Sequence, residues 1–91
     1  MDTKSTIYNL IINNIDCTKI DVIDDSYKHA NHKKDTRGGH YRLLIVSDDF
    51  KNISLINRHK LIYKILDKLM KVKIHALSMQ ILTKEEYHSK L

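Results

Sequence analysis

The chain has 91 residues, of which 42% are hydrophobic and 30% charged, and it carries a net charge of +5. This size predicts a single domain, 1–91, around one small core, and the composition is typical of a globular protein rather than a disordered one. Its longest apolar run is far shorter than the roughly 18 residues of a membrane span, so we expect a soluble protein without membrane contact. The positive charge favours an acidic protein or a nucleic acid as partner.

The single cysteine and the N-terminal segment bear on the compartment. Cys17 has no second cysteine with which to form a disulfide, which favours a reducing environment. The N-terminal segment lacks a basic-then-apolar secretory signal and an Arg-rich transit pattern. We therefore expect a cytoplasmic protein, with a mitochondrial one as the alternative.

The first half of the chain predicts one helix and two strands. Residues 3–15 carry apolar side chains at helical spacing, with Thr3 or Ser5 available as an N-cap. Residues 19–24 alternate polar and β-branched side chains, which is typical of a half-buried strand. Residues 41–47 are mostly large and apolar, and we expect a second strand there.

The remaining segments predict a long loop, a helix, a strand and a short helix. Residues 28–39 are polar and contain both glycines, which indicates a flexible loop between the first two strands. From 55 to 69, apolar side chains define one helical face on which Leu55 and His59 lie. Residues 74–82 alternate again, and Thr83 before two glutamates is typical of a helix cap.

The order helix, strand, strand, helix, strand, helix predicts an α/β fold of the two-layer α+β type. Helices cover one face of a three-stranded mixed sheet, because the strand–helix–strand unit over 41–82 has to cross over right-handed to return to the sheet.

Four separated blocks of sequence carry a resemblance to a known family. They are residues 45–50 (IVSDDF), 57–63 (NRHKLIY), 74–78 (IHALS) and 83–87 (TKEEY). In this order and spacing they resemble the BolA family over residues 18–87. The resemblance implies a fold similar to class II KH domains.

The family usually has glycine at the position of Asn52 and often tryptophan at the position of Tyr87. Asparagine tolerates a left-handed backbone, so the turn at residue 52 is expected to survive. Tyr87 keeps an aromatic side chain near the end of the chain. Cys17 lies outside the loop in which family cysteines act, and we interpret it as a small buried apolar residue.

The resemblance also implies a function without enzymatic activity. Family members are partners of monothiol glutaredoxins in iron–sulfur cluster handling, so the chain is expected to be a monomer alone and a heterodimer with its partner. His75 matches the family histidine that binds a [2Fe–2S] cluster, and His29 or His40 matches a second ligand. Thiolates of glutaredoxin and glutathione supply the other ligands.

The ligand inventory is consistent with such a shared cluster. A [2Fe–2S] cluster takes four ligands, and this chain has six histidines but one cysteine, so it can supply imidazoles but no all-thiolate site. By period-two counting alone, His75 lies on the same side as Leu77 and Met79, at the rim of the core, where a histidine commonly bonds a backbone carbonyl. The resemblance favours the ligand role instead. His59 is interpreted as structural.

Three alternatives remain beside the cluster adaptor. Arg58, Lys60 and Lys64 form a basic helix face, which is either a solvated surface or a docking surface for an acidic partner or nucleic acid. The chain lacks the G-x-x-G loop of KH domains, which weakens the nucleic-acid hypothesis. A zinc site built from His29, His40 and His75 is a further hypothesis. An enzyme is disfavoured, because no nucleophile with a base, phosphate loop or paired carboxylates is evident.

Overall fold

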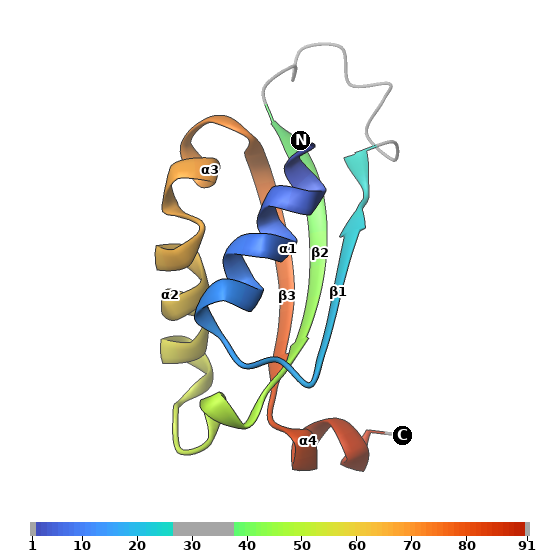
Figure 1. Cartoon of the computed structure of the whole chain (residues 1–91), viewed down its shortest axis with the longest axis vertical. Helices are drawn as coiled ribbons and strands as arrows, with labels where there is room; N and C mark the ends of the chain where they lie inside the picture. The colour runs from blue at the N-terminus through green and yellow to red at the C-terminus, as the bar shows by residue number, and fades with distance from the viewer. Residues whose placement is uncertain (1, 27–37, 91) are drawn as a thin grey trace.

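The structure is a computed structural model that describes residues 2–26 and 38–90. Figure 1 shows α1, α2 and α3 on one face of a three-stranded sheet, with α4 at one end of it. Within the described ranges, no helix combines the length and the apolar character that crossing a membrane requires. The elements in chain order are α1 (Thr3–Asn14), β1 (Lys19–Asp24), β2 (Gly39–Val46), η2 (Asp48–Phe50), α2 (Leu55–Ile65), α3 (Asp67–Val72), β3 (Ile74–Leu82) and α4 (Lys84–Ser89).

The sheet has the order β1-β2-β3 and is mixed. β1 runs antiparallel to β2, with Lys19 opposite Val46, and β3 runs parallel to β2, with Tyr41 opposite Leu77. The parallel pair is connected through α2 and α3, which lie on the same face as α1. The predicted two-layer fold class is therefore confirmed.

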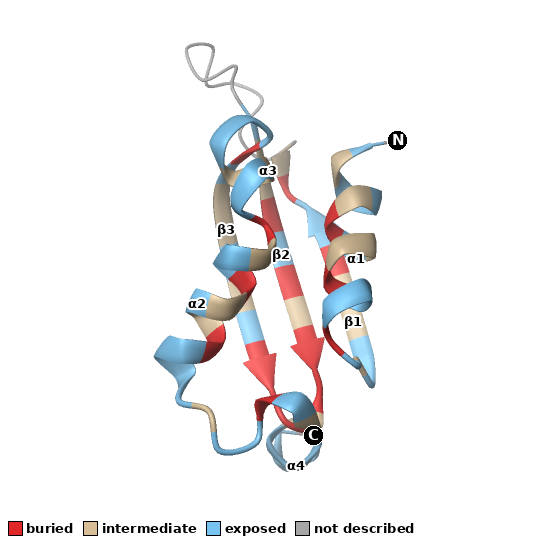
Figure 2. Cartoon of the chain, turned by 60° about the vertical axis from the view of Figure 1, so that its left-hand side comes forward, coloured by how far each residue is buried: buried red, intermediate tan, exposed pale blue. Residues whose placement is uncertain are grey.

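The core fills the space between the sheet and the helices, as the buried positions in Figure 2 show. Alternate residues of β2 point into it, because side chains on a strand alternate between the two faces. The predicted apolar side of the first helix is also confirmed. The residues of these two elements that belong to the buried core cluster are Ile7, Ile11, Tyr41, Leu43 and Ile45.

The N-cap predicted for the first helix is wrong, whereas the one predicted for the last helix is confirmed. α1 is capped by Asp2, whose carboxylate accepts a hydrogen bond from the Ser5 amide at 2.7 Å. The prediction of Thr3 or Ser5 is wrong, because both residues already lie inside the first turn. The predicted cap at Thr83 is confirmed, since Thr83 and Glu86 form a reciprocal capping box.

The predicted main helix is divided into α2 and α3 at Leu66, which is fully buried. Its buried face agrees with the predicted one at Ile62 and Leu66 but differs in the first turns of the helix. Leu55 is 61% exposed and His59 is only partly buried, whereas Arg58 points inward. His59 donates from Nδ1 to the Leu55 carbonyl at 2.9 Å, which fits its interpretation as a structural residue.

Asn52 has a φ of 64°, so the left-handed turn inferred for this position is present. We expect Asn52→Ala to lower the free energy of unfolding by about 1 kcal/mol, because a Cβ without a compensating side-chain amide disfavours this conformation. Asn52→Gly should leave stability nearly unchanged. Urea denaturation of both variants tests this, and equal losses for alanine and glycine would contradict it.

Candidate metal centre

Two of the three histidines predicted as metal ligands lie together at one end of the sheet. His40 is the second residue of β2, and His75 is the second residue of the neighbouring parallel strand β3. Their ring centroids are 5.1 Å apart, with an angle of 48° between the ring planes. The third candidate, His29, lies outside the described residues, as does most of the predicted loop 28–39.

A register irregularity explains how His75 reaches His40. Gly39 lies opposite Ile74 and His40 lies opposite Ala76, so His75 is one extra residue on β3. Such a bulge breaks the alternation of side chains between the two faces of a strand. Ile74 is therefore the buried residue, at 4% exposure, and His75 is exposed. The placement of His75 at the rim of the core, obtained by period-two counting, is wrong for this reason.

The backbone of His40 is held by the end of β1. Its amide donates to Ser26 Oγ at 3.0 Å, and its carbonyl accepts from the Asp25 amide at 2.7 Å. Asp25 is buried, and its carboxylate accepts from Arg42 Nε at 2.6 Å. The charge of buried Asp25 is therefore compensated by Arg42, and the ion pair joins the end of β1 to β2.

The described residues supply two imidazoles and no complete metal site. Across residues 2–26 and 38–90, no group of three or more His, Cys, Asp or Glu side chains is arranged to hold a metal ion. An open hollow of about 290 Å³ adjoins His40 and extends past Arg42 to Ser78. The site can therefore hold a metal only together with ligands from elsewhere, and His40 and His75 are accessible to them.

The separation of the two rings fits a pair of imidazoles on one metal. With a metal–nitrogen bond of about 2.0–2.1 Å and tetrahedral angles, two ring centroids lie about 5 Å apart. The 5.1 Å between His40 and His75 matches this value. Replacement of two thiolates by two histidines on one iron is a known mode of [2Fe–2S] ligation. Two imidazoles are thus the kind of donors that occupy two of the four ligand positions in that mode.

Arg58 does not belong to an exposed basic face. It is 5% exposed, and its guanidinium pairs with the Glu86 carboxylate at 2.6 Å. The same group also donates to the carbonyls of Ile53 at 2.8 Å and Ile81 at 2.9 Å. The fork of donors thus ties α2 to α4 and β3. The prediction that Arg58 is a binding residue is corrected accordingly.

The Arg58 guanidinium, followed by the Thr83 amide, lowers the pKa of Glu86 from 4.5 to about 2. A carboxyl with a depressed folded-state pKa stabilises the protein above its unfolded-state pKa, and this contribution is lost as the pH falls from about 4.5 to about 2. We expect Glu86→Gln to be less stable at pH 7 and to lose less stability over this acid range. Urea denaturation at several pH values measures the difference, and parallel pH profiles would contradict it.

Lys60 and Lys64 are exposed on α2, unlike Arg58 on the same helix. They are four residues apart and therefore share one helix face. These two lysines remain available for contact with an acidic partner or a phosphate backbone.

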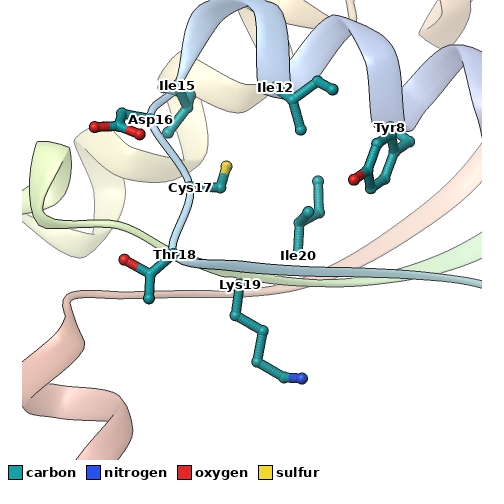
Figure 3. Close-up of a pocket in the computed structure, with 8 residues that line it drawn as sticks. All are labelled: Tyr8, Ile12, Ile15, Asp16, Cys17, Thr18, Lys19 and Ile20. Atoms are coloured by element: carbon teal, nitrogen blue, oxygen red, sulfur yellow. The ribbon is translucent and has the colours of Figure 1, made fainter.

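Cys17 lies at the opposite end of β1 from the histidine pair. It lines a hollow of about 480 Å³ with Tyr8, Ile12 and Ile20, between α1 and the start of β1 (Figure 3). Burial, and then the charges of nearby aspartates, raise the pKa of the Cys17 thiol. The residue is half-buried and packs against the core. Its thiol is therefore predominantly protonated at neutral pH, which makes it a poor metal ligand.

Three residues that support the histidine pair were not identified from the sequence as part of the site. Asp25 and Ser26 act through hydrogen bonds to the backbone of His40, and no local pattern indicates such a role. The role of Gly38 could have been predicted, because a Gly-Gly pair at the start of a strand is typical of a close approach between backbones. The sequence reasoning assigned both glycines only to loop flexibility.

Comparison with known proteins identifies the class to which this two-layer α/β domain belongs. The model of the family described as BolA-like protein matches residues 11–86. The chain belongs to the BolA-like protein family.

Similar proteins occur in several organisms. An uncharacterized protein of Buchnera aphidicola is 38% identical over 88 residues, which cover 97% of this chain and 83% of the relative. A Haemophilus influenzae protein named DNA-binding transcriptional regulator BolA is 36% identical over 63 residues, which cover 69% of this chain and 61% of that protein. The relatives thus include proteins named as regulators.

The fold agrees with solved structures from the same family. The BolA domain of SufE1 from Arabidopsis thaliana has a TM-score of 0.82 and 37% identity, with 94% of this chain and 98% of that chain covered. BolA1 from Arabidopsis thaliana also has a TM-score of 0.82, with 27% identity and coverage of 94% and 96%. The helices and the mixed sheet are therefore those of a BolA domain.

Proposed function

We propose that this chain is a non-enzymatic adaptor that binds a monothiol glutaredoxin and shares a [2Fe–2S] cluster with it. Such a complex would act in iron–sulfur cluster assembly, trafficking or iron sensing. The observation that carries the proposal is the pair of imidazoles from His40 and His75, 5.1 Å apart at an open end of the sheet. His75 is the principal ligand and His40 its companion, with His29 as the alternative companion.

The chemistry of the pair suits a shared cluster. Two imidazoles occupy two of the four ligand positions, so thiolates of glutaredoxin and of glutathione fill the other two. Imidazole binds a metal in its neutral form, so protons compete with the metal as the pH falls. A cluster held in this way is more oxidising and more labile to acid than one with four thiolates, which suits transfer or sensing.

The proposal is tested by reconstituting a cluster with the chain, a monothiol glutaredoxin and glutathione. The wild-type mixture should form a heterodimer whose visible absorption and circular dichroism differ from those of the glutaredoxin homodimer. His75→Ala should abolish this spectrum and weaken the complex. His40→Ala and His29→Ala, compared with each other, identify the companion ligand, because only the true companion should alter the spectrum.

His88→Ala is the matched control, because His88 is an exposed histidine of α4 at a different end of the sheet. It should leave both the spectrum and the affinity unchanged. An unchanged spectrum and affinity in His75→Ala would show that His75 is not a ligand. Failure of the wild-type chain to bind glutaredoxin would remove the adaptor proposal itself.

A second candidate function is nucleic-acid binding. Two relatives, from Haemophilus influenzae and Escherichia coli, are named DNA-binding transcriptional regulator BolA, and Lys60 and Lys64 are exposed on α2. If these lysines contact phosphates, Lys60→Gln with Lys64→Gln should weaken duplex binding for all sequences and reduce the salt slope by about 2. Lys4→Gln on α1 is the control. Absence of binding at low ionic strength would remove this candidate.

A further inference from the structure

We infer that Gly38 is a positioning residue for the histidine pair, because its lack of a side chain allows the backbone at residue 38 to lie directly against the bulge that contains His75. This inference rests on the proposed function only in that it concerns the same pair of imidazoles. It adds a residue that contacts no metal and is expected to set the distance between His40 and His75.

The contact between Gly38 and β3 involves backbone atoms. A Cβ on Gly38 would lie 2.8 Å from the backbone nitrogen of His75, 3.0 Å from the Ile74 carbonyl carbon and 3.1 Å from the Lys73 carbonyl carbon. Peptide atoms cannot move aside as the end of a flexible side chain can. Any side chain at residue 38 therefore has to displace the peptide that carries His75.

A hydrogen bond joins the same two segments. The Gly39 amide donates to the Lys73 carbonyl at 2.9 Å, two residues before the extra residue His75. Gly38 has a φ of 74°, a conformation that favours glycine. The backbone of residues 38 and 39 therefore packs against the start of β3 and is hydrogen-bonded to the residue that precedes it.

The two histidines consequently have separate supports. The backbone of His40 is fixed by Ser26 and Asp25 at the end of β1, whereas that of His75 is packed against Gly38. A displacement at residue 38 moves His75 while the hydrogen bonds of His40 persist. The separation of the two rings should then change without general unfolding.

The variant Gly38→Asn separates crowding from backbone strain. Asparagine adopts positive φ readily, as Asn52 does at 64°, so the main effect of this change is the added Cβ against His75. Asn52→Ala is the matched control, because it introduces backbone strain at a position with positive φ outside the histidine pair. Gly38→Ala combines both effects and should be the least stable of the three.

The first measurement uses the metal-free protein. Nuclear Overhauser contacts between the ring protons of His40 and His75 should be present in the wild type and in Asn52→Ala, and lost or strongly reduced in Gly38→Asn. Amide spectra show whether each variant is folded. A folded Gly38→Asn protein that keeps the ring-to-ring contacts would overturn the inference, whatever the outcome with glutaredoxin.

The second measurement is calorimetric titration of the full chain with Zn²⁺ alone as the probe. His75→Ala defines the binding that depends on the pair, and Gly38→Asn should weaken that binding about tenfold or more, as loss of supporting contacts around metal ligands commonly does. Asn52→Ala should bind as the wild type does. Wild-type affinity in Gly38→Asn, or in His75→Ala, would contradict the positioning role. Failure of the wild-type chain to bind glutaredoxin would instead contradict the proposed function and leave the positioning role of Gly38 standing.

Discussion

Arg58→Ala is expected to lower the free energy of unfolding by about 2–3 kcal/mol. The substitution removes a buried guanidinium that bonds the Glu86 carboxylate and the carbonyls of Ile53 and Ile81. The two carbonyls lose their charged donor, and α4 loses its ion pair to α2. Because the Glu86 side chain is 44% exposed, solvent screens the ion pair, and the loss of folding free energy is smaller than for a fully buried pair. Urea denaturation at pH 7 measures the change.

Two comparisons make this result specific to the buried geometry. Arg58→Lys should recover only part of the stability, because one ammonium group cannot reproduce the planar fork of donors. Lys60→Ala, on the exposed side of the same helix, should change stability by less than about 0.5 kcal/mol. If Arg58→Ala were as stable as Lys60→Ala, the assignment of Arg58 as a structural residue would be wrong.

Phe50→Ala is expected to cost about 3–5 kcal/mol, a large part of the stability of a domain of this size. Phe50 lies in η2, between β2 and α2, and is completely buried in the core. Its removal leaves a cavity that the surrounding helices and sheet fill only in part. Thermal and urea unfolding measure the loss.

The controls for Phe50 address the orientation of α2 as well. Phe50→Leu should cost about 1–1.5 kcal/mol, since most of the volume is retained. Leu55→Ala should be nearly neutral, because Leu55 is 61% exposed. A cost of several kcal/mol for Leu55→Ala would restore the helical face predicted from the sequence, and a small cost for Phe50→Ala would show that the core around η2 is loosely packed.

The features that depend on neighbouring residues could be predicted from the sequence. The bounds of β1 and β3 agree with the predicted strands, and the capping box at Thr83 follows from residues within one turn. The mixed sheet follows from the order of the elements and the handedness of the crossover. Asn52 was correctly expected to hold a left-handed backbone.

The features that were missed depend on residues far apart in the sequence. The inward orientation of Arg58 requires Glu86, which is 28 positions further along the chain, and the periodicity of one helix contains no information about such a partner. The exposure of His75 requires a bulge against Gly39 and His40 of the neighbouring strand. Counting along a single strand cannot reveal an extra residue, because the count assumes regular pairing.

The resemblance selected His75 as a ligand together with His29 or His40, and the structure supplies the mutual geometry of His40 and His75. It could not choose between His29 and His40 as the companion. The structure places His40 beside His75, whereas His29 lies outside the described residues. The choice is thus left to the comparison of the two alanine variants.

The parallel pairing of β2 with β3 also determines when the histidine pair can exist. His40 and His75 are separated by α2 and α3 along the chain, so their rings meet only after the crossover has formed. Parallel pairing across such a loop is slow, because its closure entropy is lost before the contacts form. A metal that needs both imidazoles therefore binds the folded chain, and a free concentration one hundred times its Kd stabilises that state by about 2.7 kcal/mol. On the proposed function, metal loading would therefore report completed folding.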